Sequence, residues 1–287
     1  MNLPPPFSVK VPEIYQIEVA SVCNFNCVMC PRTLYSRKDK TPFIDVNLIK
    51  KLIKESSFDG SYFVELQMAG EPLLHPELGK IVSMIKETGM KVGLSTNGSL
   101  IDKKIDELKE LDYVTISVDS ISKYSDIRVN GKLDVLISNI KLLRSETNAA
   151  IDLQIIEMGE WEKEVKATKE IFPDYNIRTI PDCFLTIQQS PLSPSVCNKI
   201  CLNPWLSCSI QSNGNVVPCC FCFWDDIIYG NIREASLKDI WNGKQVSLLR
   251  DQHERGGYEL ICRRCYMRSP VLLHLGIFFD SVRGNAK

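Results

Sequence analysis

The chain has 287 residues, of which 44% are hydrophobic and 24% are charged, and its 34 Lys and Arg against 35 Asp and Glu leave a formal net charge of −1. This composition is typical of a globular protein with a sizeable core, and it excludes a disordered or collagen-like chain. The charge balance gives no support to a nucleic-acid or anionic-membrane partner.

Twelve cysteines are the unusual feature of the composition. Residues 1–10 lack the basic, apolar and small-residue succession of a signal peptide, and no apolar run reaches the ~18 residues needed to span a bilayer. We therefore expect a cytoplasmic protein without a membrane segment. Because stable disulfides are rare in that compartment, the cysteines indicate metal or redox chemistry.

The cysteines divide the chain into two expected units. Three of them lie between residues 23 and 30, none lies between 31 and 182, and nine follow from Cys183 onward. We expect a first unit at residues 12–183 and a small, cysteine-rich second unit at residues 184–287.

The first unit alternates β-rich runs with amphipathic, Lys- and Glu-rich stretches. Strands are predicted at residues 14–20, 62–67, 91–95, 113–118, 151–157 and 176–180. Helices are predicted at residues 45–55, 76–88, 101–111, 133–145 and 160–172. Such repeats imply an α/β fold with parallel strands, either a barrel or an open sheet, whose active site lies at the carboxyl ends of the strands. In the second unit we expect a hairpin turning at Asn213-Gly214 and a helix at residues 236–250.

A cysteine motif follows the first predicted strand. Cys23, Cys27 and Cys30 have the spacing C-x3-C-x2-C. Three thiolates on one loop can bind one face of an iron-sulfur cubane, and because a four-iron cluster takes four ligands, one iron stays open for a chelating molecule. The alternatives are a zinc site, which prefers two C-x2-C pairs, and inert buried thiols. The tripeptide Gly70-Glu71-Pro72 at the end of the next strand favours the cluster.

This loop resembles the signature of the radical S-adenosylmethionine (SAM) superfamily. The resemblance implies a partial (β/α)6 TIM-like barrel, a 4Fe-4S cluster on Cys23, Cys27 and Cys30, and SAM bound at the open iron. One-electron reduction by a flavodoxin or ferredoxin donor would then cleave SAM to methionine and a 5′-deoxyadenosyl radical that abstracts hydrogen from the substrate. Family members often have an aromatic residue just before the third cysteine, where this chain has Met29.

The resemblance extends to the ends of the following strands. The segment Ala69-Gly70-Glu71-Pro72 matches the family's Gly-Gly-Glu-Pro motif with Ala in the first position. Its strand-end carbonyls and Glu71 would receive the SAM ammonium. The other cofactor-binding residues that the resemblance implies are Ser95, Asn97, Ser117, Asp119 and Arg128. Asn97-Gly98 is also a common turn sequence, and the alternative for Arg128 is a solvated arginine at a helix start.

The C-terminal cysteines suggest a second metal centre. Cys201 and Cys219 flank the predicted hairpin, and Cys262-x2-Cys265 forms a knuckle, so that four thiols can converge on zinc or on iron. The segment resembles the SPASM auxiliary-cluster domain of radical SAM enzymes and its shortened twitch form. Because no cysteine follows Cys265, we expect one auxiliary 4Fe-4S cluster on these four residues. This layout and the compact length resemble the aminocyclitol dehydrogenase type known from butirosin biosynthesis.

The remaining cysteines have no predicted task. They are expected to be inert thiols, although Cys197 and Cys222 could replace or extend the ligand set. The five residues are Cys183, Cys197, Cys208, Cys220 and Cys222.

Three hypotheses for the function follow. The leading one is a dehydrogenase-type radical SAM oxidoreductase that oxidises a small sugar- or cyclitol-like substrate, with the auxiliary cluster as electron acceptor. The second is a maturase that epimerises or crosslinks a ribosomal peptide. The short segment before the first strand and the single auxiliary cluster argue against it. The third, a non-catalytic zinc or iron-sulfur protein, leaves the motifs at adjacent strand ends unexplained.

Polar residues near the strand ends are candidates for substrate contacts, although a structural role is the more common one. Alternation along residues 14–20 directs Glu18 into the barrel. The full set is Gln16, Glu18, Gln67, Gln154, Glu157, Arg178 and Asp182. The histidines His75, His253 and His274 form no recognisable catalytic or metal-binding motif, and His75 is expected to start a helix. No residue is predicted to be the base that takes the substrate proton.

Overall fold

In the computed structural model, the residues described are 12, 14–34, 41–55, 63–182, 201–222, 227–259 and 262. Within these ranges one sheet runs through the molecule in the strand order β6-β5-β4-β3-β2-β1-β7-β8-β9. Its strands are β1 (Ile14–Ile17), β2 (Phe63–Leu66), β3 (Lys91–Thr96), β4 (Tyr113–Ser117), β5 (Ala150–Glu157), β6 (Asn176–Pro181), β7 (Ser207–Ile210), β8 (Asn215–Val217) and β9 (Gly230–Asn231).

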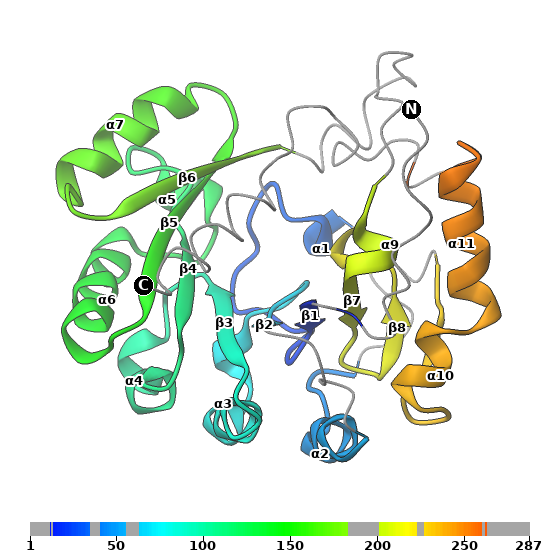
Figure 1. The fold of residues 1–287 in the computed structure, drawn as a ribbon. Helices are drawn as coiled ribbons and strands as arrows, with labels where there is room; N and C mark the ends of the chain where they lie inside the picture. Colours follow the sequence, from blue (N-terminus) through cyan, green and yellow to red (C-terminus); the bar gives the residue numbers. More distant parts are fainter. Residues whose placement is uncertain are drawn as a thin grey trace.

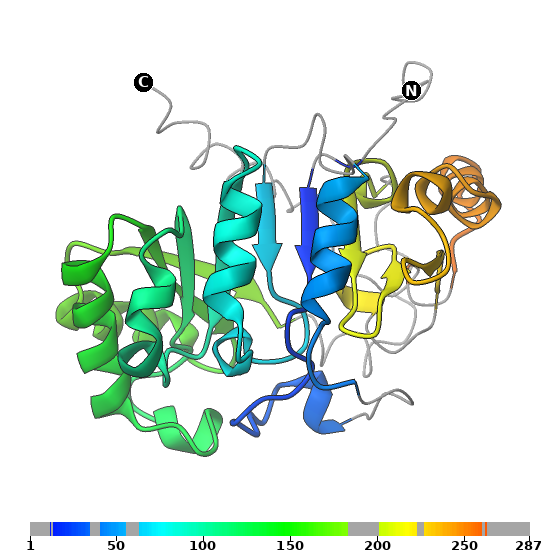
Figure 2. The ribbon, with the colours of Figure 1, turned by 90° about the horizontal axis from the view of Figure 1, so that it is seen from below.

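The sheet curves into a partial barrel with helices on its outer face (Figure 1). The first six strands are parallel, and each pairs with the next one along the chain. The helices are α1 (Pro31–Leu34), α2 (Val46–Lys54), α3 (Leu78–Lys86), α4 (Ile101–Leu108), α5 (Tyr124–Ile127), α6 (Leu133–Glu146), α7 (Trp161–Ile171), α9 (Asn203–Leu206), α10 (Leu237–Trp241) and α11 (Lys244–Glu254), with short 3-10 turns at Pro72–Leu74 and Cys220–Cys222. Figure 2 shows α2 and α3 lying against β1 and β2. The sequence prediction of an α/β barrel is confirmed.

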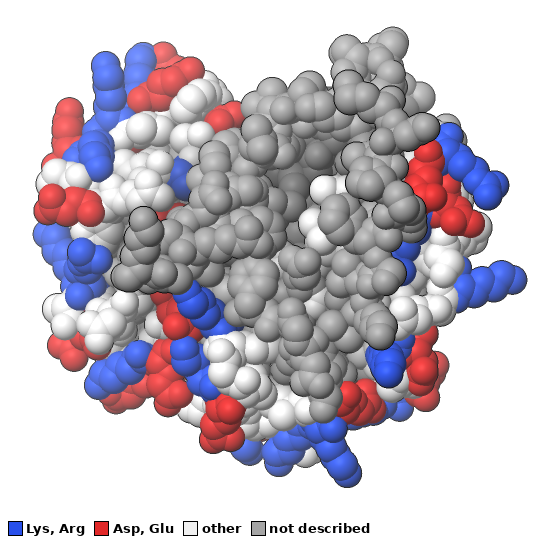
Figure 3. All heavy atoms as spheres, in the orientation of Figure 1, with Lys and Arg blue, Asp and Glu red and all other residues white. Residues whose placement is uncertain are grey.

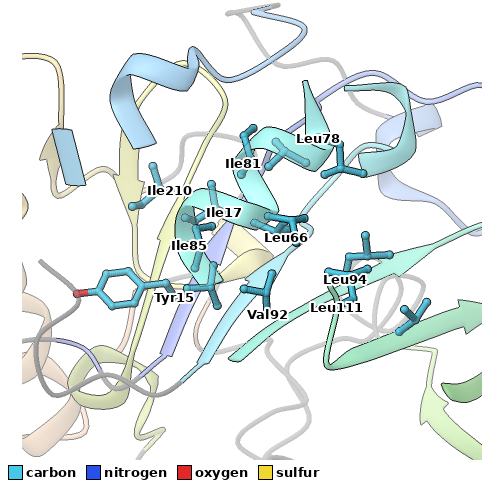
Figure 4. Close-up of a cluster of buried hydrophobic side chains, with 14 of the residues drawn as sticks. Tyr15, Ile17, Leu66, Leu78, Ile81, Ile85, Val92, Leu94, Leu111 and Ile210 are labelled. Atoms are coloured by element: carbon cyan, nitrogen blue, oxygen red, sulfur yellow. The ribbon is translucent and has the colours of Figure 1, made fainter. Parts of the chain in front are cut away.

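Alternation along the strands separates an apolar outer face from a polar inner one. Tyr15 and Ile17 of β1 are fully buried with the helices, and Leu66 of β2 and Val92 of β3 continue this layer. Leu78, Ile81 and Ile85 of α3, spaced three and four residues apart, pack onto it (Figure 4). The side chains between them, such as Gln16 on β1, therefore point into the barrel.

The second unit joins the barrel sheet directly. Strand β7 is parallel to β1, with Gln16 opposite Ser209, and β7 and β8 form an antiparallel hairpin. Gly214 has a φ of +90° in the connection, so the predicted turn at Asn213-Gly214 is confirmed. Lys51 of α2 donates from Nζ to the carbonyls of Ile232 at 2.5 Å and Ala235 at 3.2 Å. The sheet fixes the hairpin to the barrel, and the bonds from Lys51 hold the segment after β9 against α2.

Two local predictions were wrong. The helix expected at residues 236–250 is two helices, because α10 ends where the amide of Asn242 donates to the carbonyl of Lys238 and the amide of Gly243 donates to that of Ile240, and α11 starts after Gly243. His75 does not start a helix but ends the 3-10 turn at Pro72–Leu74. Its Nδ1 accepts from the amide of Glu77 at 3.0 Å, and its Nε2 bonds the carbonyl of Ile44 at 3.0 Å.

The surface has mixed charge. On the face shown in Figure 3, Lys and Arg alternate with Asp and Glu around the described rim. None of the helices in the described ranges combines the length and the apolar composition required to cross a membrane.

Leu66 tests the apolar layer between sheet and helices. We expect Leu66→Ala to lower the free energy of unfolding by about 2–5 kcal/mol, because the fully buried side chain leaves a cavity. Leu248→Ala on α11, where the side chain is 50% exposed, should change it by less than ~0.5 kcal/mol. Urea unfolding under anaerobic conditions measures both, and equal midpoints for the two variants would contradict this packing.

Candidate functional site

The cysteine loop lies between β1 and α1 and is attached to the segment after α5. The amide of Asn26 donates to the carbonyl of Val129 at 3.1 Å, and the amide of Val28 donates to that of Ile127 at 3.0 Å. Phe25, Cys27 and Met29 are buried in a small apolar cluster, and the half-buried Cys23 and Cys30 pack against it. The predicted ligands are thus brought together on one backbone segment with a fixed shape.

Two side chains, one just after β3 and one at the end of α5, direct N–H groups at these thiols. Arg128 Nη1 lies 3.6 Å from the sulfur of Cys27, and Asn97 Nδ2 lies 3.8 Å from that of Cys23. Burial raises the pKa of both thiols, and Arg128 opposes this rise at Cys27. Hydrogen bonds to sulfur are among the interactions by which proteins tune iron-sulfur clusters.

The donor set suits a 4Fe-4S cluster with one open iron. Within the described ranges, no group of three or more His, Cys, Asp or Glu side chains is arranged so that it could hold a metal ion. The fit therefore rests on the chemistry of three thiols on one short loop, with N–H donors beside two of them.

Gly70 and Glu71 join the cysteine loop to β3. A Cβ on Gly70 would lie 2.0 Å from the carbonyl oxygen of Ala20, so only glycine fits there. The buried carboxylate of Glu71 accepts from Thr96 Oγ1 at 2.6 Å, from the amide of Asn97 at 2.8 Å and from that of Leu73 at 3.1 Å. Both oxygens are thus occupied by the chain's own groups, and a contact between Glu71 and SAM stays a prediction.

Asp119 and Arg128 form a buried ion pair next to Cys27. Asp119 follows β4 with a φ of +60°, and its Oδ1 accepts from the amide of Ile156 at 2.9 Å. Burial raises the pKa of Asp119, against the opposing charge of Arg128. The alternative of a solvated Arg128 is wrong, because its side chain links Asp119 to the cysteine loop.

The other predicted SAM-site residues lie at the same ends of the sheet. Pro72 is buried at the start of the 3-10 turn, Ser95 is half-buried near the end of β3, and Ser117 ends β4 opposite Gln154. Their assignment to SAM stays a prediction.

Glu18 connects the two units through its buried carboxylate. The side chain is fully buried, and its Oε1 accepts from the amide of Ala69 at 3.3 Å while its Oε2 accepts from that of Ser212 at 3.0 Å. Its own amide donates to the carbonyl of Ile210 at 2.8 Å. The carboxylate thus joins the motif loop after β2 (residues 69–72) to the hairpin turn, which is the structural role expected to be the more common one, and a substrate contact of Glu18 stays a prediction.

The interior of the barrel has a hydrogen-bonded polar row that crosses four strands. Ser209 donates to Gln16 at 2.9 Å, Gln16 donates to Glu65 at 3.3 Å, and Ser95 also donates to Glu65 at 3.4 Å. Among the candidates at the opposite edge, Arg178 donates to Gln154 at 2.8 Å. The sequence reasoning missed Glu65, although the alternation along residues 63–67 contained the signal.

The remaining candidates have structural partners or lie outside the described residues. Glu157 accepts from Thr179 at 2.9 Å, and Asp182 is half-buried just after β6. The His253 ring packs edge-on against Trp205 and Tyr258, and His274 is outside the described ranges.

The C-terminal cysteines are described only in part. Cys201, Cys219, Cys220 and Cys262 are half-buried, whereas Cys183, Cys197 and Cys265 lie outside the described ranges. A hydrogen bond with the buried Cys222 lowers the pKa of the Cys219 thiol. Cys208 is fully buried in β7, as expected for an inert thiol, and burial raises its pKa.

Gly70 tests the close approach of the motif loop to the cysteine loop. Gly70→Ala should lower the free energy of unfolding by about 1–3 kcal/mol or more, because backbone has to move to admit the methyl group. Gly257→Ala is the matched control, since the nearest atom to its Cβ would be 3.9 Å away. Denaturant unfolding of both variants gives the comparison, and an unchanged Gly70→Ala protein would refute the contact.

Glu18 tests the link between the units. We expect Glu18→Gln to cost about 1–3 kcal/mol of unfolding free energy, because the amide nitrogen would face one of two buried backbone N–H donors. Glu160→Gln, which removes an exposed carboxylate paired with Lys163, should cost less than about 1 kcal/mol. Thermal and urea unfolding measure both, and a Glu18→Gln protein as stable as the control would argue against the link.

Two family models match the chain. Residues 17–153 match the radical SAM superfamily, and residues 201–266 match SPASM, an iron-sulfur cluster-binding domain. These ranges contain the cysteine loop with its neighbouring strand ends and the C-terminal cysteines.

Relatives and solved structures agree with both models. A tungsten-containing aldehyde ferredoxin oxidoreductase cofactor-modifying protein of Pyrococcus furiosus is 25% identical over 82% of each chain. The S-adenosyl-L-methionine-dependent 2-deoxy-scyllo-inosamine dehydrogenase of Niallia circulans is 25% identical over 89% of this chain and 93% of its own.

Among solved structures, BtrN in complex with AdoMet and 2-DOIA superposes with a TM-score of 0.62 at 22% identity, covering 89% of this chain and 93% of its own. Streptococcus suis SuiB bound to precursor peptide SuiA gives a TM-score of 0.63 at 15% identity, covering 83% and 66%. With the cysteine loop, the strand-end motif and the hairpin in place, the chain carries a radical SAM domain followed by a SPASM iron-sulfur cluster-binding domain.

Proposed function

We propose that this radical SAM enzyme abstracts hydrogen from a small sugar- or cyclitol-like substrate and oxidises it, with an auxiliary 4Fe-4S cluster as electron acceptor. The observation that carries the proposal is the polar row inside the barrel, formed by Ser209, Gln16, Glu65 and Ser95. A substrate rich in hydroxyl groups needs such donors and acceptors once it leaves water, because unpaired polar groups are costly to bury.

The SAM-cleaving centre is assigned to the cysteine loop. Cys23, Cys27 and Cys30 would hold the cluster, which when bound supplies the electron that cleaves SAM. Arg128 and Asn97 direct N–H groups at Cys27 and Cys23 and stabilise negative charge on those sulfurs. Asp119 holds Arg128 in this position through the buried ion pair.

The strand ends around this loop are the proposed SAM site. Glu71 holds the hydroxyl of Thr96 and the backbone amide of Asn97 against the motif loop, and we assign the neighbouring strand-end carbonyls as acceptors for the SAM ammonium group. The further residues assigned to SAM are Gly70, Pro72, Ser95, Asn97, Ser117, Asp119 and Arg128.

The second centre is assigned to Cys201, Cys219, Cys262 and Cys265. The pairing of β7 with β1 supports a role in the same reaction, because it attaches the hairpin that carries Cys219 to the barrel sheet. The buried Glu18 carboxylate adds a second attachment through Ser212. We assign electron delivery to a flavodoxin or ferredoxin in the cytoplasm.

The relative in Niallia circulans favours a cyclitol over a peptide, because its dehydrogenase acts on 2-deoxy-scyllo-inosamine and the match covers 89% of this chain. The second candidate substrate is a ribosomal peptide to be epimerised or crosslinked. It is supported by the fold shared with SuiB bound to its precursor peptide.

Metal content tests the two ligand sets. Anaerobically reconstituted protein should bind roughly eight irons per chain, as expected for two four-iron clusters, and the triple variant with Cys23, Cys27 and Cys30→Ala should keep about four. That variant should form no 5′-deoxyadenosine from SAM and dithionite. Cys208→Ala, which removes a buried thiol outside both sets, should keep roughly eight. Zinc with little iron in the unaltered protein would exclude the radical chemistry.

Isotope transfer tests the substrate class. The enzyme is incubated with SAM and dithionite, and either with 2-deoxy-scyllo-inosamine deuterated at its carbinol carbons or with Cα-deuterated ribosomal peptides. We expect deuterium in 5′-deoxyadenosine from the cyclitol. Transfer from a peptide alone would reverse the assignment.

A further inference from the structure

Glu65 is a buried carboxylate at the centre of the polar row. It lies on β2 between the outward-facing Val64 and Leu66, which are fully buried in the apolar layer. Its side chain therefore points into the barrel, where Gln16 donates to it from β1 and Ser95 donates to it from β3. Gln67, two residues further along the same face of β2, also hydrogen-bonds it.

The hydrogen bonds to Glu65 from the neighbouring strands are long. The distances of 3.3 Å from Gln16 Nε2 and 3.4 Å from Ser95 Oγ exceed the ordinary range, and both donors are neutral. An ionised carboxylate has about four acceptor positions, so these contacts leave capacity for a closer and stronger donor.

Each of the other interior carboxylates has a charged partner or at least one hydrogen bond of 3.0 Å or less. Glu18 accepts two backbone amides, and Glu71 accepts three groups at 3.1 Å or less. Asp119 is paired with a guanidinium. Asp152 accepts from the hydroxyl of Tyr113 and, at 2.8 Å, from Asn176. Among these five, Glu65 is the carboxylate whose bonds from the neighbouring strands are both longer than about 3.2 Å and come from neutral groups, so a closer donor can compete with them.

The charged group that acts on Glu65 lies on a strand that does not pair with β2. Burial raises the pKa of Glu65, and the positive charge of Arg178 on β6 opposes that rise. The groups that face it from β1, β2 and β3 are the uncharged Gln16, Gln67 and Ser95.

We propose that Glu65 accepts the hydroxyl proton of the substrate alcohol during its oxidation; this rests on the proposed function. The alcohol loses its carbon-bound hydrogen atom to the 5′-deoxyadenosyl radical, which becomes 5′-deoxyadenosine. It loses the hydroxyl proton to the Glu65 carboxylate and one electron to the oxidised auxiliary iron-sulfur cluster. Two electrons and two hydrogens thus leave the alcohol, and a ketone forms.

Position along the strands supports this role. Ser95, which contacts Glu65, is two residues before Asn97, whose side chain contacts Cys23. Gln16 links Glu65 on its other side to Ser209 of the hairpin strand β7. The carboxylate therefore lies on a chain of contacts between the proposed SAM site and the auxiliary-cluster domain.

The test uses the reconstituted enzyme with SAM, a chemical reductant and 2-deoxy-scyllo-inosamine as the probe. Glu65→Gln keeps the shape of the side chain but removes its ability to take a proton. We expect kcat for ketone formation to fall about 10²- to 10⁴-fold with KM changed less than ~3-fold, the range typical of a lost general base. Asp152→Asn, which alters an interior carboxylate that already has partners, should leave kcat within ~3-fold.

A pH profile separates proton transfer from a structural effect. The unprotonated carboxylate is the active form, so kcat/KM of the unaltered enzyme should rise with pH through the raised pKa of Glu65 and then level off. The Asp152→Asn variant should keep this rise of kcat/KM on the acid side of the profile, the acid limb. Glu65→Asp, which retains a carboxylate, should recover part of the lost rate and keep an acid limb at a shifted pH.

The possible outcomes distinguish the two proposals. Unaltered enzyme that transfers no deuterium from the cyclitol refutes the proposed function, and the role of Glu65 falls with it. Active enzyme together with a Glu65→Gln variant that keeps kcat and the acid limb overturns the role of Glu65 alone. A variant that raises KM without lowering kcat makes Glu65 a binding contact and also overturns it. If Glu65→Gln binds less iron than the unaltered protein, the pH dependence of kcat/KM of Glu65→Asp is the deciding measurement. A fall in kcat/KM at the same low pH as in the unaltered enzyme then refutes the proposal.

Discussion

A buried carboxylate at the end of β1 fixes the relation between the two units of this protein. Glu18 accepts the amide of Ala69, in the motif loop after β2, and the amide of Ser212, in the hairpin turn of the SPASM domain. A buried carboxylate is costly unless donors satisfy it, so both segments are held where their amides reach it. The cysteine loop begins five residues later, at Cys23, and depends on the same strand end.

The rest of the site is formed by contacts between the loops that follow neighbouring strands. Gly70 lets the motif loop touch Ala20, and Glu71 then reaches β3, where Asn97 contacts Cys23. On the other side Arg128 joins Asp119 to Cys27. The polar row inside the barrel begins two residues before Asn97, at Ser95.

Much of the fold was predictable from the sequence because its signals are local. The six parallel strands and the five longer helices of the first unit lie within a few residues of their predicted positions, since alternation and helical spacing report burial directly. The split between α10 and α11 was missed, because a glycine helix end inside an amphipathic stretch is a weak signal. The alternation along residues 63–67 places Glu65 on the interior face, but it says nothing of the partners from β1 and β3, and Glu65 was missed.

The sequence by itself determined the class of chemistry. Three cysteines at C-x3-C-x2-C and the later cysteines indicate iron-sulfur or other metal chemistry through residue type and spacing, and the resemblance of this loop and of Gly70-Glu71-Pro72 to the radical SAM motifs implies SAM. Only the tertiary structure decided what each buried charge does. It made Glu18 a link between units, paired Arg128 with Asp119 and left Glu65 with long, neutral hydrogen bonds. The reason is that the state of a buried carboxylate depends on donors from distant segments, whose distances no local pattern contains.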